Sequence, residues 1–324
     1  MPRKAAVAER ARTPNSAPAN KNATGRASKG ARLHRLLICG IALIGVVVFL
    51  FPTIANWFSS LDYKEQREKY TELTQSLSSD ERDRLLFAAH NYNKHLPSGP
   101  LRDPYMLDDA GQTVDLRDDN ENYLSQLNLG KGKEMGWIEI PNIHVSLPIH
   151  HGTDAKTLEL GAGHLHGSAL PVGGTSTHAV VTAHSGRATS QLFTDLDKLK
   201  KGDVFYSEVL GERFYYRVDN IEVVDPLYSG DKLRQIAGED HLTLLTCTPT
   251  GVNSHRLLVR GVRIDNPEGE SAEKEVRAKD YVADFPWWIP VVIGVPTTAW
   301  FVLAAADKRG GRTRRNTTNK LAAR

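Results

Sequence analysis

Cys247 is the residue whose chemistry stands out first in this sequence. It is one of two cysteines among 324 residues, and it ends the alternating apolar run HLTLLTC just before a Thr-Pro-Thr-Gly turn. Most free cysteines are small buried side chains without reactivity. At a strand end beside a turn, however, a side chain is well placed for chemistry, and a thiolate is a strong nucleophile. A free thiol has a pKa of about 8.5, so Cys247 needs a base or a cation nearby.

His184 and Arg256 are the candidates for that base and that cation. His184 is one of twelve histidines and ends a second strand-like run, VVTAHSG, so the two strand ends can meet at one rim of a barrel. Arg256 begins the outgoing run, where a guanidinium would favour a thiolate and could hold a carbonyl oxygen. Arg260 shares its face by strand parity, whereas His255 points to the opposite face. Arg256 alone could equally be a surface charge.

Five segments together resemble a known family. They are TLLTCTPTG, GAGHLHGSALPVGG, THAVVTAHSG, QLFTDLDKLKKGD and NSHRLLVRG, between about Ile138 and Arg263. They are similar to the corresponding segments of sortases, the cysteine transpeptidases of Gram-positive cell surfaces. The similarity is greatest to class C, the pilin-polymerising sortases, whose members carry a second, C-terminal membrane segment.

The resemblance implies roles for the three candidates and a reaction. Cys247 is the nucleophile, His184 the acid and base, and Arg256 the oxyanion-stabilising or substrate-orienting residue. The implied reaction cleaves an LPxTG-like sorting signal between Thr and Gly and joins the acyl group to a lysine amine of a pilin. It needs no cofactor and no metal. Two positions depart from class C, since Thr250 replaces a common aromatic residue and Ser185 a common basic one.

The same resemblance implies a lid over the site. Leu96 to Gln112 is rich in Pro, Gly and Asp, which predicts a loop. Class C members carry an Asp-Pro-aromatic motif ahead of the barrel, and the tripeptide here is Asp103, Pro104 and Tyr105. Asp103 is then expected to pair with Arg256 and Tyr105 to pack near Cys247. We expect a partly exposed ion pair worth about 0.2–1 kcal/mol. Without the resemblance, this would be an ordinary solvated loop.

The elements around these residues indicate a mainly β fold. Short runs rich in β-branched and aromatic residues, separated by turn residues, predict strands at 136–152, 178–186, 203–225, 241–247 and 255–264. They describe one mostly antiparallel barrel or sandwich, and the resemblance implies the closed sortase-type barrel with short helices. Helices are predicted at 61–96, with a restart at the capping pattern Ser78 and Glu81, and in a short piece at 191–199.

Two uncharged segments predict membrane helices. Leu36 to Ala55 covers roughly 30 Å as a helix, the thickness of a bilayer core. Phe285 to Ala306 contains three prolines and three tryptophans, which suit a membrane helix better than a buried one. A cleaved signal peptide is the alternative for the first segment, but its apolar run is too long. Cys39 lies inside this segment, so we expect no disulfide with Cys247.

The flanking charges predict the orientation. Residues 1–35 carry +8 and residues 307–324 carry +6, so a chain of net charge +3 leaves 3 − 8 − 6 = −11 for residues 36–306. Basic flanks stay cytoplasmic, which puts both termini inside and the barrel outside the cell membrane. Nucleic-acid binding by the basic tails is disfavoured, since the charges adjoin apolar spans.

The predicted organisation has seven parts. They are a disordered basic tail at 1–35, a membrane helix at 36–56, a helical region and lid loop at 57–129, the catalytic barrel at 130–265, a linker at 266–284, a membrane helix at 285–306 and a basic tail at 307–324. The expected function is pilin polymerisation. The alternatives are a housekeeping sortase that attaches surface proteins to peptidoglycan, and a non-catalytic membrane-tethered β-domain for adhesion.

Overall fold

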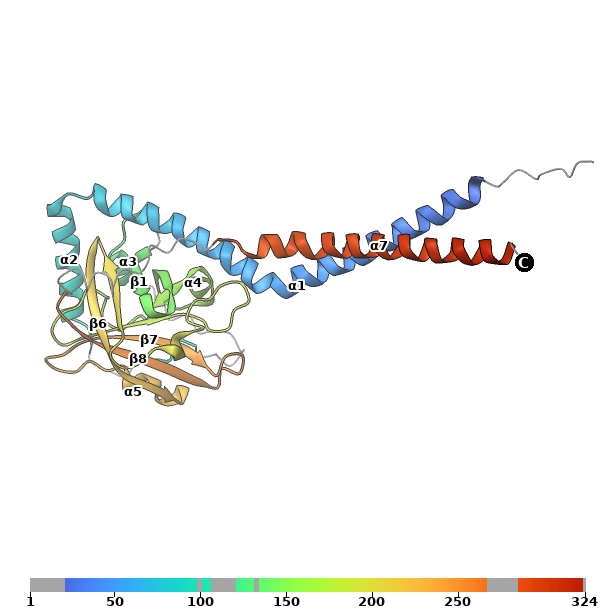
Figure 1. Ribbon diagram of the computed structural model, residues 1–324. Helices are drawn as coiled ribbons and strands as arrows, with labels where there is room; N and C mark the ends of the chain where they lie inside the picture. Colours follow the sequence, from blue (N-terminus) through green and yellow to red (C-terminus); the bar gives the residue numbers. More distant parts are fainter. Residues whose placement is uncertain (1–20, 98–100, 106–120, 131–133, 267–284, 323–324) are drawn as a thin grey trace, which may run out of the picture. The chain divides into compact units, whose positions relative to one another are not determined.

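A computed structural model describes residues 21–97, 101–105, 121–130, 134–266 and 285–322 (Figure 1). They belong to two compact units, one from Met1–Phe49 with Trp287–Arg324 and one from Leu50–Pro286. The helical elements are α1 (Lys21–Ser76), α2 (Ser79–Lys94), α3 (Glu121–Ser125), the 3-10 turn η1 (Pro141–Ile143), α4 (Ala155–Leu160), the 3-10 turn η2 (Leu196–Lys198), α5 (Pro226–Lys232) and α7 (Trp288–Ala322).

Eight strands form the second unit's centre. They are β1 (Glu134–Ile140), β2 (Val145–His151), β3 (Ala162–His164), β4 (Thr177–Thr182), β5 (Val204–Val209), β6 (Glu212–Val224), β7 (Asp240–Thr248) and β8 (His255–Arg263). They close into a barrel in the order β1-β2-β3-β4-β7-β8-β6-β5. The prediction of a closed, mainly β fold is confirmed. Two of the pairings, β2 with β3 and β4 with β7, are parallel.

Several predicted boundaries are confirmed and others are corrected. Ser78 caps α2 by accepting a hydrogen bond from the Glu81 backbone amide at 3.2 Å, as the capping pattern predicted. The helix expected at 191–199 is reduced to η2, because Leu192 has a left-handed φ of 44° that an α-helix excludes. The tail predicted to be disordered to residue 35 is helical from Lys21. A helix extends outward from an apolar span at low cost once it is nucleated.

Parts of five predicted segments lie outside the described residues. These are residues 1–20 of the first tail, 98–100 and 106–120 of the helical region and lid loop, 131–133 of the barrel, 267–284 of the linker and 323–324 of the second tail.

Strand alternation separates the barrel interior from a smaller cluster on its outer face. On β7 and β8, Leu242, Leu244, Leu257 and Val259 point into the main core. Their neighbours Leu245 and Leu258 point outward and form a second buried cluster with Leu165, Val180 and Leu233. An exterior sheet face is buried in this way only if another segment covers it.

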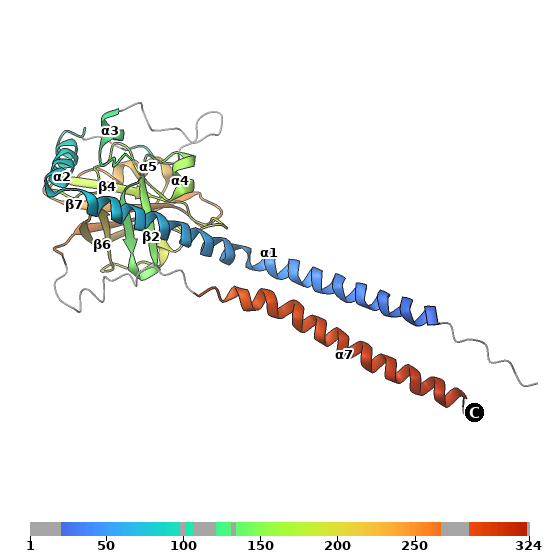
Figure 2. The ribbon, with the colours of Figure 1, turned by 90° about the horizontal axis from the view of Figure 1, so that it is seen from above.

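Helix α1 packs against the barrel through its second half (Figure 2). Tyr70 is buried, and its hydroxyl accepts a hydrogen bond from the Leu210 amide at 2.9 Å. Arg67 lies 2.8 Å from Glu208 and over the Trp137 ring at 5.1 Å. This helix therefore belongs to the barrel unit from residue 50 onward.

Among the described residues, two helical stretches are long and apolar enough to cross a membrane, Arg32–Ser76 of α1 and Trp288–Asp307 of α7. The first unit holds the part of α1 up to Phe49 together with α7. Arg35 pairs with Asp307 at 2.6 Å and lies over the Trp300 ring at 5.8 Å. The Cys39 thiol donates to the Pro296 carbonyl at 3.4 Å. The two cysteines are both free.

Candidate active site

Cys247 and Arg256 are direct partners across β7 and β8. The antiparallel register pairs the two residues, so their side chains lie on the same face. That face is the outer one, because Cys247 has the parity of Leu245 and Arg256 that of Leu258. Both are buried, with 8% of Cys247 and 6% of Arg256 exposed. The sequence predicted a position at the barrel rim, and the structure places the pair on the covered outer face near the strand ends.

His184 lies level with Cys247. It follows β4 by two residues, and the parallel register of β4 with β7 pairs Thr182 with Leu245. The alignment continues past the end of the strand, since the Ala183 amide donates to the Leu245 carbonyl at 3.3 Å. Ser185 Oγ donates to the Cys247 carbonyl at 2.7 Å. The backbone on both sides of His184 is thus attached to the strand that carries Cys247.

A short segment, residues 101–105, crosses this outer face, and we call it the strap. Asp103 accepts two hydrogen bonds from Arg256, at 2.8 Å from Nε and 3.0 Å from Nη2. The expected pairing is therefore present, but its expected partial exposure is wrong. The Asp103 side chain is 2% exposed and that of Arg256 7%, because the strap lies flat on the barrel. The stabilisation of about 0.2–1 kcal/mol that is typical of an exposed ion pair therefore does not apply to this buried pair.

Tyr105 closes the strap over the catalytic candidates. Its hydroxyl donates to the Ala183 carbonyl at 2.8 Å and accepts from Thr182 Oγ1 at 2.8 Å. Its ring centre lies 5.7 Å from that of His184, and the Arg256 guanidinium lies 5.1 Å from the tyrosine ring centre. Tyr105 therefore touches the elements that carry the candidate base and the candidate cation.

Helix α5 supports the strap from the other side, which the sequence did not indicate. Ser229 is buried, and its hydroxyl donates to Asp103 at 3.1 Å. A Cβ atom at Gly230 would lie 1.7 Å from the Leu101 carbonyl oxygen, so only glycine lets the strap approach this closely. The turn composition of the α5 region contains no signal for these contacts.

Burial favours the neutral forms of both Cys247 and His184. Burial raises the pKa of the Cys247 thiol, Arg256 opposes this shift, and Asp103 adds to it. Burial also lowers the pKa of the His184 imidazole, with a further lowering by Arg187 and an opposing effect of Glu159. Under the strap, the thiol with a neutral imidazole is therefore favoured over the charged pair.

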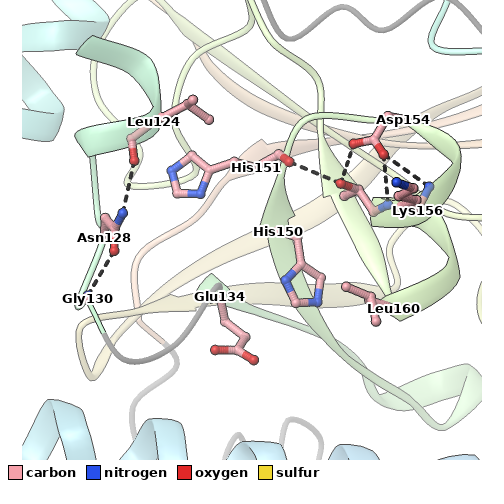
Figure 3. Close-up of a pocket in the computed structure, with 10 residues that line it drawn as sticks. Leu124, Asn128, Gly130, Glu134, His150, His151, Asp154, Lys156 and Leu160 are labelled. Carbon is pink, nitrogen blue, oxygen red and sulfur yellow. Dashed lines mark hydrogen bonds between the residues drawn. The ribbon is translucent and has the colours of Figure 1, made fainter. Parts of the chain in front are cut away.

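Arg260 and a pocket of the barrel unit lie apart from this site. Arg260 shares the outer face but pairs with Asp219 at 2.5 Å. A pocket of about 490 Å³, lined by residues of α3, β2 and α4, contains none of the predicted site residues (Figure 3). Asp154 in it accepts hydrogen bonds at the start of α4, from the amides of Lys156 and Thr157. Within the described ranges, no three His, Cys, Asp or Glu side chains group as metal ligands.

Comparisons with known proteins agree with this geometry. Residues 138–264 match the family model described as the sortase domain. The chain is 47% identical to the sortase C-1 structure of Actinomyces oris, with a TM-score of 0.52, covering 57% of this chain and 99% of that one. The chain is 42% identical to the structure named pilus-related sortase C of Group B Streptococcus, with a TM-score of 0.54, covering 61% of this chain and 96% of that one.

Curated relatives are more distant. Sortase A of Bacillus anthracis is 30% identical over 140 residues, which are 43% of this chain and 63% of the relative. The chain spans between 58% and 65% of the length of the curated relatives it matches.

Proposed function

The chain belongs to the sortase family, and on this premise we propose that it is a membrane-anchored cysteine transpeptidase that links pilin subunits. The observation that carries the proposal is the cross-strand pair of Cys247 and Arg256, with His184 level beside it and the strap above. A nucleophile, a proton carrier and a planar cation on one face are the parts that acyl transfer needs.

The first half of the reaction forms a thioacyl-enzyme. His184 takes the thiol proton while Cys247 Sγ attacks the Thr carbonyl of an LPxTG-like signal. The developing oxyanion receives hydrogen bonds from the Arg256 guanidinium. His184 then gives its proton to the amine of the departing Gly, and the Thr–Gly bond breaks.

The second half transfers the acyl group. A lysine amine of another pilin attacks the thioester carbonyl, and His184 accepts the proton that the amine loses. The C–S bond breaks, Cys247 is restored as a thiol, and an isopeptide bond remains. Since Asp103 occupies both Nε and Nη2 of Arg256, the strap must leave before a substrate oxygen can take its place.

Polymerisation is favoured over attachment to peptidoglycan by three observations. The structural relatives include sortases named C-1 and pilus-related, the Asp103–Arg256 strap is in place, and a second long apolar helix, α7, follows the barrel. A non-catalytic adhesion domain would have no use for a strapped nucleophile. We further propose that both apolar helices span the cell membrane, with the barrel outside.

The test is a transfer assay with the full chain in detergent micelles. A peptide that ends in an LPxTG-like signal is mixed with a lysine-containing pilin or with a peptidoglycan amine, and mass spectrometry identifies the product. Cys247→Ala is expected to abolish transfer, whereas the matched Cys39→Ala retains it. Lysine-linked product supports polymerisation, and product only with the peptidoglycan amine supports the alternative. Transfer by pure Cys247→Ala enzyme would overturn the mechanism.

A further inference from the structure

The loop that follows His184 is fastened to helix α1. Its tip, residues 189–191, touches the part of α1 at the end of the predicted membrane span at 36–56 and directly after it. Three side chains of α1 make the contacts. They are Asn56, whose Oδ1 accepts from the Gln191 amide at 2.8 Å; Ser59, whose hydroxyl donates to the Thr189 carbonyl at 2.8 Å; and Tyr63, whose hydroxyl lies 3.3 Å from Ser190 Oγ.

The same loop is closed at its base on His184 itself. The Phe193 amide donates to the His184 carbonyl at 3.1 Å. The Gly186 amide donates to Thr194 Oγ1 at 3.0 Å. A displacement of the loop tip is therefore transmitted to the backbone that carries the imidazole.

The junction between loop and helix is closely packed. Ser190 and the α1 residue Ser60 are both buried. The cavity between α1, the start of β2 and the loop has a volume of only about 20 Å³, comparable to a single water. By contrast, Ala188 and Thr189 are exposed. Movement of the tip is therefore limited by its contacts with α1, together with one hydrogen bond of 3.4 Å from Gln191 Nε2 to the Ile143 carbonyl.

We propose that Asn56, Ser59 and Tyr63 of α1 are positioning residues for His184. The inference rests on the proposed transpeptidase function, in which the imidazole moves a proton between the thiol and two amines. Such a group must stay within hydrogen-bond reach throughout the reaction. A misplacement of about 1 Å can cost up to 100-fold in rate, although no substrate contact is lost.

The loop also sets the electrostatic surroundings of His184. Arg187, within the loop, lies 3.8 Å from Glu159 of α4, and these two charges act on the imidazole in opposite directions. The Tyr105 ring of the strap lies 5.7 Å from the imidazole between ring centres, and Cys247 on β7 lies level with His184 by the strand register. If the loop is released, burial decreases and Arg187 moves away, and both changes raise the pKa of His184.

The experiment compares two sets of changes in the full chain in detergent. The test variant combines Asn56→Leu, Ser59→Ala and Tyr63→Phe. The matched control is Tyr70→Phe, which also removes an α1 hydroxyl that bonds to the barrel, but far from the His184 loop along the helix. A third variant, Asn56→Asp, keeps an oxygen acceptor for the Gln191 amide.

We expect the triple variant to lose about 10-fold in kcat with unchanged KM. The ascending limb of its pH–rate profile is expected to move to higher pH. Tyr70→Phe and Asn56→Asp are expected to keep the wild-type kcat and profile. A wild-type kcat and pH limb in the triple variant, or an equal kcat loss in Tyr70→Phe, would overturn the inference. Absence of transfer by the wild-type chain would instead contradict the proposed function.

Discussion

Arg256 is held by every nitrogen of its guanidinium. Nε and Nη2 bond to Asp103, and Nη1 donates to the carbonyls of Asn253 and His255 at 3.2 Å. A group oriented in this way presents two coplanar N–H donors to whatever replaces Asp103. Lysine has the same charge but lacks the planar fork. The orientation of Arg256, more than its charge, is what the site would use against an oxyanion.

Arg256→Lys should therefore lose most transfer activity. Removing one oxyanion donor from an enzyme typically costs about 100- to 1,000-fold in rate, and we expect a loss of at least about 100-fold in kcat/KM. Steady-state transfer with the purified full chain measures it. Arg260→Lys is the matched control, because Arg260 lies on the same face but pairs with Asp219. A lysine variant nearly as active as the wild type would mean that Arg256 acts only as a bulk charge.

Asp103→Asn should lower the pKa of the Cys247 thiol. The Asp103 charge and the burial under the strap both raise this pKa, and the substitution removes the first and weakens the second. A lower thiol pKa means more thiolate at a given pH, so the midpoint of the alkylation rate against pH is expected at lower pH. Asp219→Asn, which removes another arginine-paired carboxylate on this face, should leave the midpoint in place. An unchanged midpoint for Asp103→Asn would show that strap and thiol are not coupled.

At this scale, much of the candidate site could be predicted from sequence. Cys247 and Arg256 lie close together because the run into the thiol and the run out through the arginine form one hairpin. The support of the strap could not be predicted. Ser229 and Gly230 lie more than a hundred residues from Asp103, and only the packing of α5 brings them into contact with the strap. The burial of the Asp103–Arg256 ion pair follows from that packing, so it could not be predicted from the sequence either.

At the scale of elements, the strap is a short segment that nevertheless makes close contacts with the barrel. It covers the site through Leu101, Asp103 and Tyr105, and each of these contacts a different part of the barrel face. Removing Asp103 would leave the charge of Arg256 buried and without its ion-pair partner. A strap without its anchors can lift, however, and water can then reach the arginine.

The double variant Asp103→Ala with Tyr105→Ala should thus react faster at Cys247 with a bulky thiol reagent. We expect a loss of about 1.5–3 kcal/mol in the free energy of unfolding, the range for hydrogen bonds to charged groups. Labelling kinetics and chemical denaturation measure the two effects, and Leu227→Ala on the exposed side of α5 is the control. Equal labelling rates in the wild type and the double variant would mean that the strap does not limit access.

The contact of α1 with the barrel contains a carboxyl group with an unusual titration. Glu139 on β1 is buried, and burial raises its pKa to about 7 against the opposing charge of Arg67. Ser146 of β2 donates to it, Glu208 of β5 raises its pKa further, and Arg213 of β6 lowers it. Glu139 is therefore largely protonated at acid pH and about half protonated near neutral pH.

Glu139→Gln should stabilise the chain increasingly as pH rises. In the unfolded chain Glu139 ionises above about pH 4.5 and in the folded chain only near 7, so the wild type loses stability across this interval. Glutamine does not titrate, and the difference in Tm, variant minus wild type, is expected to grow from pH 5 to pH 7 and then level off. The exposed Glu65→Gln should show no such trend. A difference that shrinks with rising pH would refute the assignment.

Strand elements could be predicted from sequence better than the short helices. Alternation of side chains is strong over the 9 residues of β7 and of β8, which were both expected. β3 has 3 residues and α4 has 6. These elements are too short to show the two-residue alternation of a strand or the 3.6-residue period of a helix. In the 191–199 segment the amides of Gln191 and Phe193 donate to Asn56 of α1 and to the His184 carbonyl, and the residues after them form only three-residue turns, such as Leu196 amide to Phe193 carbonyl. These tertiary contacts are not revealed by the composition of the segment.

At the scale of the whole molecule, the distribution of apolar and charged residues separates the proposed membrane-spanning segments from the barrel. α7 and the part of α1 up to Phe49 belong to one unit, and the rest of α1 belongs with the strapped barrel to the other. α1 is a single helix from Lys21 to Ser76, so the apolar span and the contacts to the His184 loop lie on the same element. A proposed pilin substrate would also emerge from a membrane, which makes an anchored enzyme a suitable partner for it.

The charge distribution predicts how that anchored chain is oriented. The flanks carry +8 and +6, whereas residues 36–306 carry −11. Because basic segments next to short apolar spans stay on the cytoplasmic side, a reporter fused to either terminus should be active only inside the cell. Protease added outside whole cells should cut within residues 57–284 and leave both reporters attached to membrane fragments. Replacing the seven basic residues of 307–324 by glutamine should weaken retention of the C-terminus inside, while the same number of glutamines placed on the barrel surface should not. A C-terminal reporter accessible from outside in the unchanged chain would rule out two spans, and loss of the N-terminal reporter would indicate a cleaved signal peptide instead of a membrane helix.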